Sequence, residues 1–143
     1  MVDKEVIRKK MQELNSYLKE IEGLKTIPWD EFSSSLSKQW MVSHGLQLSI
    51  QIVIDIGSHI LAVLGETQIE DYVDIIDKLG ERGIIPSEFA EKIRGMAGLR
   101  NILVHEYAEL DLNKIYDILQ NRLIDFYDFI RYIKQFLEKE QKV

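Results

Sequence analysis

Residues 46–64 read LQLSIQIVIDIGSHILAVL, which is the most apolar stretch in a chain of 143 residues. Apolar residues recur along it at helical steps of three and four, and Leu48, Ile52 and Ile56 lie off that stripe. A helix with one face exposed to solvent usually carries apolar residues on the opposite face alone. The segment therefore predicts either a central helix of a bundle or one half of a dimer interface. Polar residues interrupt the stretch at several positions, which argues against a membrane span.

The same helical period extends through almost the whole chain, and no strand pattern or internal repeat interrupts it. Upstream, an apolar stripe over residues 7–21 predicts a first helix that ends near Gly23. Residues 30–64 fit either one long helix or two. The weak point of a single helix would be residues 43–45, which include a glycine.

Downstream, three further helices are expected, and a capping or turn residue marks the start of each. The starts are the capping-box pair Thr67 and Glu70, then Pro86 in the first turn of a helix over residues 87–105, then Asp111 as an N-cap. In the last helix Arg122 is the one polar break in the apolar stripe, and residues 138–143 are expected to form a short tail. Residues 1–143 are thus predicted to be one all-α domain, a bundle of four to six helices with short connections and an antiparallel core.

The composition excludes several classes of protein. The chain has no cysteine, which excludes a disulfide scaffold, a thiolate zinc site and a cysteine nucleophile. Its 18 Lys and Arg against 24 Asp and Glu give a net charge of −6, which argues against a protein that coats nucleic acid. A local basic cleft remains compatible with that total. The charged N-terminal residues do not resemble a secretion signal, so a cytoplasmic location is expected.

One candidate polar pair lies inside the apolar stretch. His59 follows Asp55 by one helical turn, so the two side chains share a face. A carboxylate in such a run needs a partner, because burying it alone is expensive. The favoured interpretation is a satisfied structural pair. The functional alternative is an acid that orients an imidazole near a site.

A denser group of polar residues lies in residues 95–107, GMAGLRNILVHEY. Arg100, Asn101, His105 and Tyr107 stand at the end of a predicted helix. On an ideal helix Asn101 and His105 share a face, whereas Arg100 lies roughly 140° from His105. Arg100 and His105 can therefore converge on one ligand if the helix ends near His105, or if a second copy of the chain contributes across a two-fold axis.

This spacing resembles the motif of HEPN domains, in which four residues separate an Arg from a His and one residue separates that His from a Tyr. Here these residues are Arg100, His105 and Tyr107, with Asn101 directly after the Arg. The surrounding block, residues 96–107, is similar to the HepT-like branch of that family. The resemblance implies a helical bundle that pairs into a homodimer. In the ribonuclease members it also implies RNA cleavage without a metal, in a cleft at the dimer interface, where the RNA 2′-hydroxyl attacks its own phosphate.

The resemblance assigns the catalytic roles to Arg100 and His105, with Asn101 as a supporting group and with no metal or cofactor. A histidine titrates near neutrality, which suits proton transfer at the 2′-hydroxyl or at the leaving oxygen. An arginine offers a planar, permanently charged fork to the phosphoryl oxygens. Local positive charge for RNA, either tRNA or mRNA, is expected from Lys92, Arg94 and Arg100 in each copy.

The HepT-like branch is similar in role to toxins of type VII-like toxin–antitoxin systems. Their partner is a minimal nucleotidyltransferase antitoxin, which can silence the toxin by AMPylation of the motif tyrosine, here Tyr107. The structural alternative for Tyr107 is an aromatic side chain that packs at a helix end. Two alternatives to a ribonuclease stay open: a non-catalytic module that binds nucleotides or a partner, and a structural dimer in which Arg100 and His105 bond inside the bundle.

Overall fold

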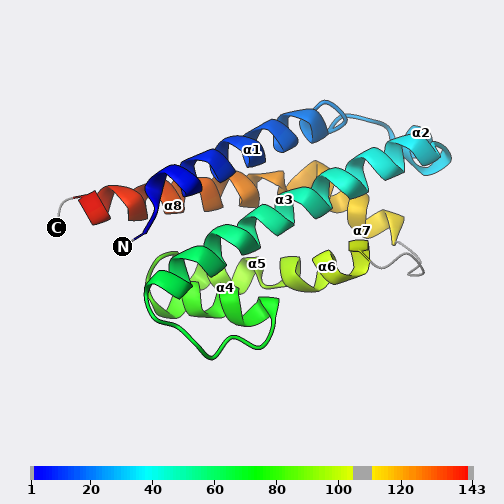
Figure 1. Cartoon of the computed structure of the whole chain (residues 1–143). Coiled ribbons are helices and arrows are strands. Elements are labelled where there is room, and N and C mark those ends of the chain that lie inside the picture. Colours follow the sequence, from blue (N-terminus) through cyan, green and yellow to red (C-terminus); the bar gives the residue numbers. More distant parts are fainter. Residues whose placement is uncertain (1, 105–110, 142–143) are drawn as a thin grey trace.

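The computed structural model describes residues 2–104 and 111–141, and the elements in these ranges are all helices (Figure 1). In chain order they are α1 (Lys4–Glu22), α2 (Trp29–Ser34), α3 (Leu36–Val63), α4 (Tyr72–Glu81), α5 (Ser87–Ile93), α6 (Gly95–Val104), α7 (Leu112–Asp117), the π-helical turn η1 (Ile118–Arg122) and α8 (Leu123–Gln141). The prediction of an all-α bundle is confirmed.

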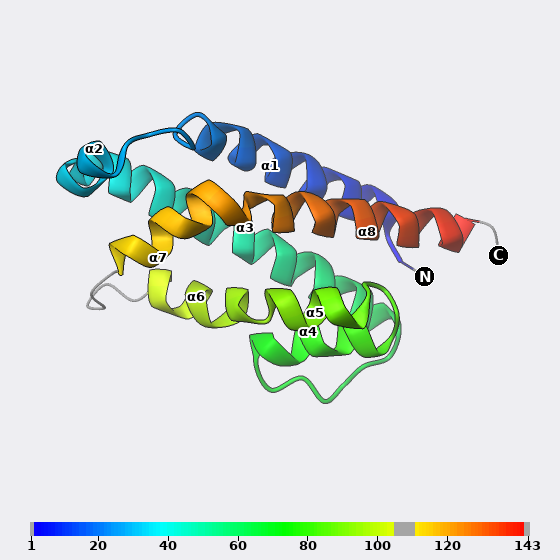
Figure 2. The same cartoon turned by 180° about the vertical axis from the view of Figure 1, so that it is seen from behind.

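The central element is α3, which contacts α1 and α8 on one side and α4 and α6 on the other (Figures 1 and 2). Its buried residues come from several faces, namely Val42, Leu46, Ile50, Ile52, Val53, Ile54, Ile56, Ile60 and Leu61. By length and composition alone α3 could cross a membrane, but more than half of its most apolar window is buried within the bundle. The apolar stretch that opens the sequence is therefore a central core helix.

Residues 30–64 form two helices, and the break lies at Ser35 rather than at residues 43–45. Ser35 has extended backbone and its hydroxyl caps α3 by accepting from the Lys38 backbone N–H at 3.4 Å. The predicted weak point is helical throughout. A Cβ added at Gly45 would lie 2.7 Å from Cγ1 of Ile21, so the missing side chain lets α1 cross close to α3. The glycine thus serves packing and does not end the helix.

The helix expected from Thr67 starts one turn later than predicted. The capping box consists of Asp71 and Asp74, each of which binds the other's backbone N–H. Residues 64–71 run back along α3, so α4 starts beside the middle of α3 and points in the same direction (Figure 1). The antiparallel arrangement expected of consecutive helices therefore holds for α1 and α3 but not for α3 and α4.

The two predicted C-terminal helices are both interrupted. The helix expected over residues 87–105 breaks between α5 and α6 at Arg94. The last helix contains the turn η1, whose wider winding shifts the buried stripe by one residue. Leu119 and Leu123 are buried where Ile118 and Arg122 were expected to continue the stripe. The expected tail over residues 138–143 is also corrected, since α8 continues to Gln141.

One cluster of buried apolar side chains connects all of these helices. Its largest fully buried members include Phe32 of α2, Leu14 of α1, Ile50 of α3 and Phe126 and Phe129 of α8. Full burial of each such side chain contributes about 1.5–3 kcal/mol relative to exposure. This shared core fixes α6 against α3 and α4, which is the junction where the motif arginine lies.

Candidate functional site

The motif arginine lies where α3, α4 and α6 meet. On α6, Ala97 and Leu99 are buried against the core, and Arg100 follows them on the same side of the helix as a half-buried residue. Asn101 is exposed. His105 and Tyr107, the other two motif residues, lie outside the described residues, so their roles stay predictions.

Three contacts hold the Arg100 guanidinium. Its Nε donates a hydrogen bond to Oε1 of Gln51 on α3 at 3.0 Å. The guanidinium carbon lies 4.7 Å from the centroid of the Tyr72 ring on α4, within the range of a cation–π contact. Its Nη1 donates to Oδ1 of Asn101 at 3.4 Å, so the predicted supporting residue contacts Arg100 directly. Three helices thus fix the position of one side chain.

The contact with α3 continues beyond Gln51. The Gln51 side-chain Nε2 donates to Oδ1 of Asp55 at 2.8 Å. The other carboxylate oxygen of Asp55 lies 3.7 Å from Nζ of Lys10 on α1. A polar chain therefore runs from α1 across α3 to the motif arginine on α6, and Asp55 belongs to it.

The structure gives the candidate pair Asp55 and His59 separate partners. His59 Nε2 accepts a hydrogen bond from the backbone N–H of Asp3 at 3.4 Å. Asp3 is the N-cap of α1 and accepts from the Val6 backbone N–H. His59 therefore ties the start of α1 to α3, while Asp55 contacts Gln51 and Lys10. No hydrogen bond joins Asp55 to His59, and both residues lie in the described part of the chain.

Of the three cations expected to provide local positive charge, Arg94 and Lys92 form ion pairs with carboxylates. Arg94 donates through Nε and Nη2 to the two carboxylate oxygens of Asp77 at 2.7 and 3.2 Å, and this bonding raises the pKa of Arg94 further above its ordinary value. Lys92 pairs with Asp125 at 3.3 Å. Within residues 2–104 and 111–141, Arg100 forms no ion pair with a carboxylate. Among the described residues, Arg100 is therefore the one of these three cations whose charge is not paired with a carboxylate.

A second polar cluster consists of Lys92, Arg122 and Asp125. The Asp125 carboxylate, with 1% of its side chain exposed, accepts from Arg122 Nε at 2.7 Å and faces Lys92. Arg122 also donates to the Lys92 backbone carbonyl at 3.3 Å. The cluster borders a cavity of about 150 Å³. Its bonds join α5 to η1 and α8, so the cluster stabilises the packing of these helices. In the sequence, the only sign of this cluster is the polar break at Arg122.

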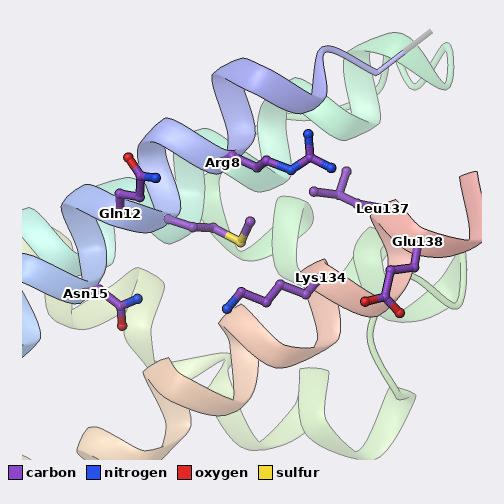
Figure 3. A pocket seen from close by; sticks show the side chains of 7 residues that line it. Arg8, Gln12, Asn15, Lys134, Leu137 and Glu138 are labelled. Carbon is purple, nitrogen blue, oxygen red and sulfur yellow. The ribbon is translucent and has the colours of Figure 1, made fainter. Parts of the chain in front are cut away.

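A larger groove lies between α1 and α8 (Figure 3). It has a volume of about 350 Å³, and its lining consists of Arg8, Met11, Gln12, Asn15, Lys134, Leu137 and Glu138. Of the predicted site residues that the structure describes, none borders this groove. Separately, the described residues hold no group of three or more His, Asp or Glu side chains arranged to bind a metal ion.

Two residues of the Arg100 site, Gln51 and Tyr72, are not among the site residues predicted from the sequence. Gln51 precedes Asp55 by one helical turn, a spacing that can link the two side chains, but in the sequence Gln51 stands out only as a polar interruption of an apolar run. Tyr72 gives no such signal. It reaches Arg100 only because residues 64–71 return along α3, and that path is a property of the tertiary structure.

Comparison with known proteins identifies relatives over most of the chain. The family model described as "Ribonuclease HepT-like" matches residues 14–133. A protein named tRNA nuclease HepT from Aphanizomenon flos-aquae is 30% identical over 132 residues, which cover 92% of this chain and 90% of the relative. A protein named mRNA nuclease HepT from Shewanella oneidensis is 34% identical over 106 residues, which cover 73% of this chain and 78% of the relative.

Solved structures show the same fold. A tri-AMPylated HEPN toxin of Shewanella oneidensis, solved in complex with its MNT antitoxin, superposes with a TM-score of 0.84 at 29% identity. The superposition covers 94% of this chain and 99% of that one. A toxin–antitoxin structure with AMP-PNP superposes with a TM-score of 0.81, also at 29% identity, over 92% of this chain and 98% of that one.

Proposed function

The chain belongs to the HepT-like ribonuclease family, and we propose that it is the ribonuclease toxin of a toxin–antitoxin pair, cutting RNA with Arg100 and His105. The observation that carries the assignment to this site is the state of Arg100. It is a half-buried cation, held by a neutral amide and an aromatic ring and without a carboxylate partner in the described part of the chain. Such a group is prepared to receive an anion.

The proposed reaction is internal transfer of an RNA phosphate. The 2′-hydroxyl attacks the adjacent phosphorus, and the bond to the 5′-oxygen of the next nucleotide breaks. His105 exchanges the proton at the 2′-hydroxyl or at the leaving oxygen. The Arg100 guanidinium stabilises the negative charge that builds on the phosphoryl oxygens, and because its position is fixed before the reaction, little reorganisation is needed. The reaction requires no metal ion in this proposal.

We also propose that two copies share the cleft. The first half of α3 exposes large apolar side chains: Leu36, Trp40 and Met41 are 57%, 63% and 54% exposed. Ile102 on α6, close to Arg100 in sequence, is 41% exposed. Exposed apolar side chains on the motif helix α6 and on α3, which contacts it, suit a second copy. In the proposed pair, Arg100 and His105 of both copies serve one cleft.

The proposed partner is a minimal nucleotidyltransferase that modifies Tyr107 with AMP. The support is the AMPylated toxin–antitoxin complex to which this fold is similar. A nucleotide phosphate beside His105 would add negative charge where RNA phosphate must bind, and so would block the substrate. The substrate class is tRNA or mRNA, as in the names of the two nuclease relatives, and the cytoplasm is the proposed location.

The deciding experiment is cleavage of total tRNA and of mRNA in buffer containing EDTA. We expect the wild-type protein to cut one of them, and Arg100→Ala and His105→Ala to be slower by at least about 100-fold. Arg131→Ala on α8 is the matched control, because Arg131 pairs with Asp128 on the surface and should leave the rate unchanged. Wild-type rates in both motif variants would disprove the assignment. No cleavage, together with a tight nucleotidyltransferase complex, would favour the non-catalytic binding module.

Modification of Tyr107 has a separate test. The protein is incubated with the partner enzyme and ATP, and its intact mass is measured. We expect a gain of one or more AMP units in the wild-type protein and none in Tyr107→Phe. A gain that persists in Tyr107→Phe would place the modification elsewhere.

A further inference from the structure

We propose that Gln51 and Asp55 form a positioning relay that aims Arg100 at the substrate phosphate while leaving its charge free. This inference rests on the proposed function and adds two residues of α3 to the motif residues. The relay consists of two hydrogen bonds in series, from Arg100 Nε to the Gln51 oxygen and from the Gln51 nitrogen to Asp55.

The orientation of the Gln51 amide follows from its neighbours. The Asp55 carboxylate only accepts hydrogen bonds, and the Arg100 guanidinium only donates them. The amide satisfies both only when its NH₂ group faces Asp55 and its oxygen faces Arg100. Asp55 therefore selects the amide orientation that can hold the arginine, although it lies one helical turn away from Gln51 and does not touch Arg100.

An amide suits this position better than a carboxylate. The guanidinium groups of Arg82, Arg94 and Arg122 bind the carboxylates of Glu66, Asp77 and Asp125, so each of these arginines is neutralised within the bundle. A carboxylate in place of Gln51 would likewise neutralise Arg100 and compete with the substrate phosphate. The neutral amide fixes the guanidinium at Nε and leaves N–H groups of both Nη atoms available.

Tyr72 restricts the remaining freedom of Arg100. The centroid of its ring lies 4.7 Å from the guanidinium carbon, and this cation–π contact brings no anionic charge to Arg100. The amide of α3 holds Nε, and the ring of α4 contacts the guanidinium. The position of the guanidinium is thereby set before any phosphate arrives, which is the condition for efficient electrostatic stabilisation.

The relay is only partly buried. The side chain of Asp55 is 39% exposed and its second oxygen faces Lys10 at 3.7 Å. Removing a partly exposed hydrogen bond has a small effect on folding stability. A relay that acts on Arg100 should therefore show a large effect on cleavage with a small effect on the unfolding midpoint.

The experiment compares the full-length variants Gln51→Ala, Asp55→Ala, the double variant and Gln51→Glu. Gln12→Ala on α1 and Asp128→Asn on α8 are the matched controls, since both residues lie outside the Arg100 site. The first readout is kcat and KM for RNA. We expect Gln51→Ala to lower kcat by about 10- to 100-fold. Asp55→Ala should lower it less, and the double variant should equal Gln51→Ala, because Asp55 acts through Gln51.

Gln51→Glu separates position from charge. The new carboxylate can still hold Nε, but it neutralises Arg100. We therefore expect a raised KM, with a smaller fall in kcat than in Gln51→Ala. The relay would be overturned if the double variant lost the product of the two single losses in kcat. It would also be overturned if Gln51→Ala cut RNA at the same rate as Gln12→Ala.

The second readout does not depend on catalysis. In ¹⁵N NMR, the Arg100 Nε–H signal is identified by its loss in Arg100→Lys. We expect it to be ordered in the wild type and averaged in Gln51→Ala. If the wild type cuts no RNA, the proposed function fails while this measurement still judges the contact. The proposal is overturned if the Arg100 Nε–H signal stays ordered in Gln51→Ala. It is also overturned if that signal becomes mobile while the rate of RNA cleavage does not change.

Discussion

At the scale of single residues, two charged side chains, the buried carboxylate of Asp125 and the half-buried guanidinium of Arg100, have opposite kinds of partner. Asp125 is buried and receives Arg122 and Lys92, because a buried carboxylate without cations would be costly. Arg100 receives an amide and a ring. Within residues 2–104 and 111–141, the buried carboxylate is thus neutralised by cations, whereas the motif arginine that the family resemblance assigns to RNA has no carboxylate partner.

Asp125 gives a direct test of this difference. We expect Asp125→Asn to lower the free energy of unfolding by about 1–3 kcal/mol, because it removes the charge that pairs with Arg122 and Lys92. Urea denaturation followed by circular dichroism measures the change. Asp128→Asn on the same helix is the control, and its loss should stay below about 1 kcal/mol, since that ion pair lies at the surface. Equal losses in the two variants would contradict the role assigned to Asp125.

Glu66 predicts a pH dependence of stability. The hydrogen bond from Arg82, helped by the charge of Lys78, lowers the pKa of Glu66 below its ordinary value of 4.5, although partial burial opposes this. A lowered folded-state pKa means that the contribution to stability is present above that ordinary value and is lost as the pH falls through the lowered pKa. Urea midpoints of the wild type and Glu66→Gln should therefore differ at neutral pH and converge in acid. A difference that grows in acid would show the opposite sign.

At the scale of helices, periodicity predicted which segments are helical but not where they break. The stripe over residues 7–21 and the apolar face of α3 follow directly from the sequence. The breaks at Ser35 and Arg94 and the turn η1 carry no strong local signal. Residues 43–45 looked weaker than Ser35, because the close approach of Ile21 to Gly45 can be seen only once α1 and α3 are packed.

Two glycines show how packing decides the effect of one substitution. A Cβ at Gly80 of α4 would lie 2.7 Å from Cβ of Ala90, which is fixed to the α5 backbone, so Gly80→Ala should cost about 1–2 kcal/mol. At Gly98 of α6, an added Cβ would have no atom of the described residues within 4 Å beyond the neighbouring backbone of its own helix. There the better helix propensity of alanine should stabilise the chain by about 0.5–1 kcal/mol. Thermal unfolding of both variants tests the pair, and shifts of the same sign would contradict it.

At the scale of the whole molecule, the site was only half predictable. The motif on α6 indicated Arg100 and Asn101, and the structure brings both into contact. Gln51 lies on α3, and its helical spacing links it to Asp55 but not to Arg100. Tyr72 reaches Arg100 because of the path of residues 64–71, and no local pattern in the sequence contains that path.

The proposed homodimer is tested at the same scale. Trp40 is the most exposed of the large apolar side chains on α3, so Trp40→Asp should place a charge in the interface and shift the protein from dimer to monomer. Sedimentation velocity at micromolar concentration measures the mass. Ile124→Asp on α8 is the control, since Ile124 is 56% exposed on another helix and should leave the mass unchanged. A wild-type monomer would contradict the shared cleft.

The bundle is closed by its first and last helices, and this sets the order in which a newly made chain can fold. Tyr127 on α8 donates to Glu22 at the end of α1, and burial together with this bond raises the pKa of Tyr127 to about 12. During synthesis α1 and α3 can pack on each other first, but the parts of their apolar faces that α8 covers stay exposed until α8 has left the ribosome. A chain cut short before Leu123 keeps those parts in water, so interrupted translation should yield insoluble fragments rather than an active nuclease.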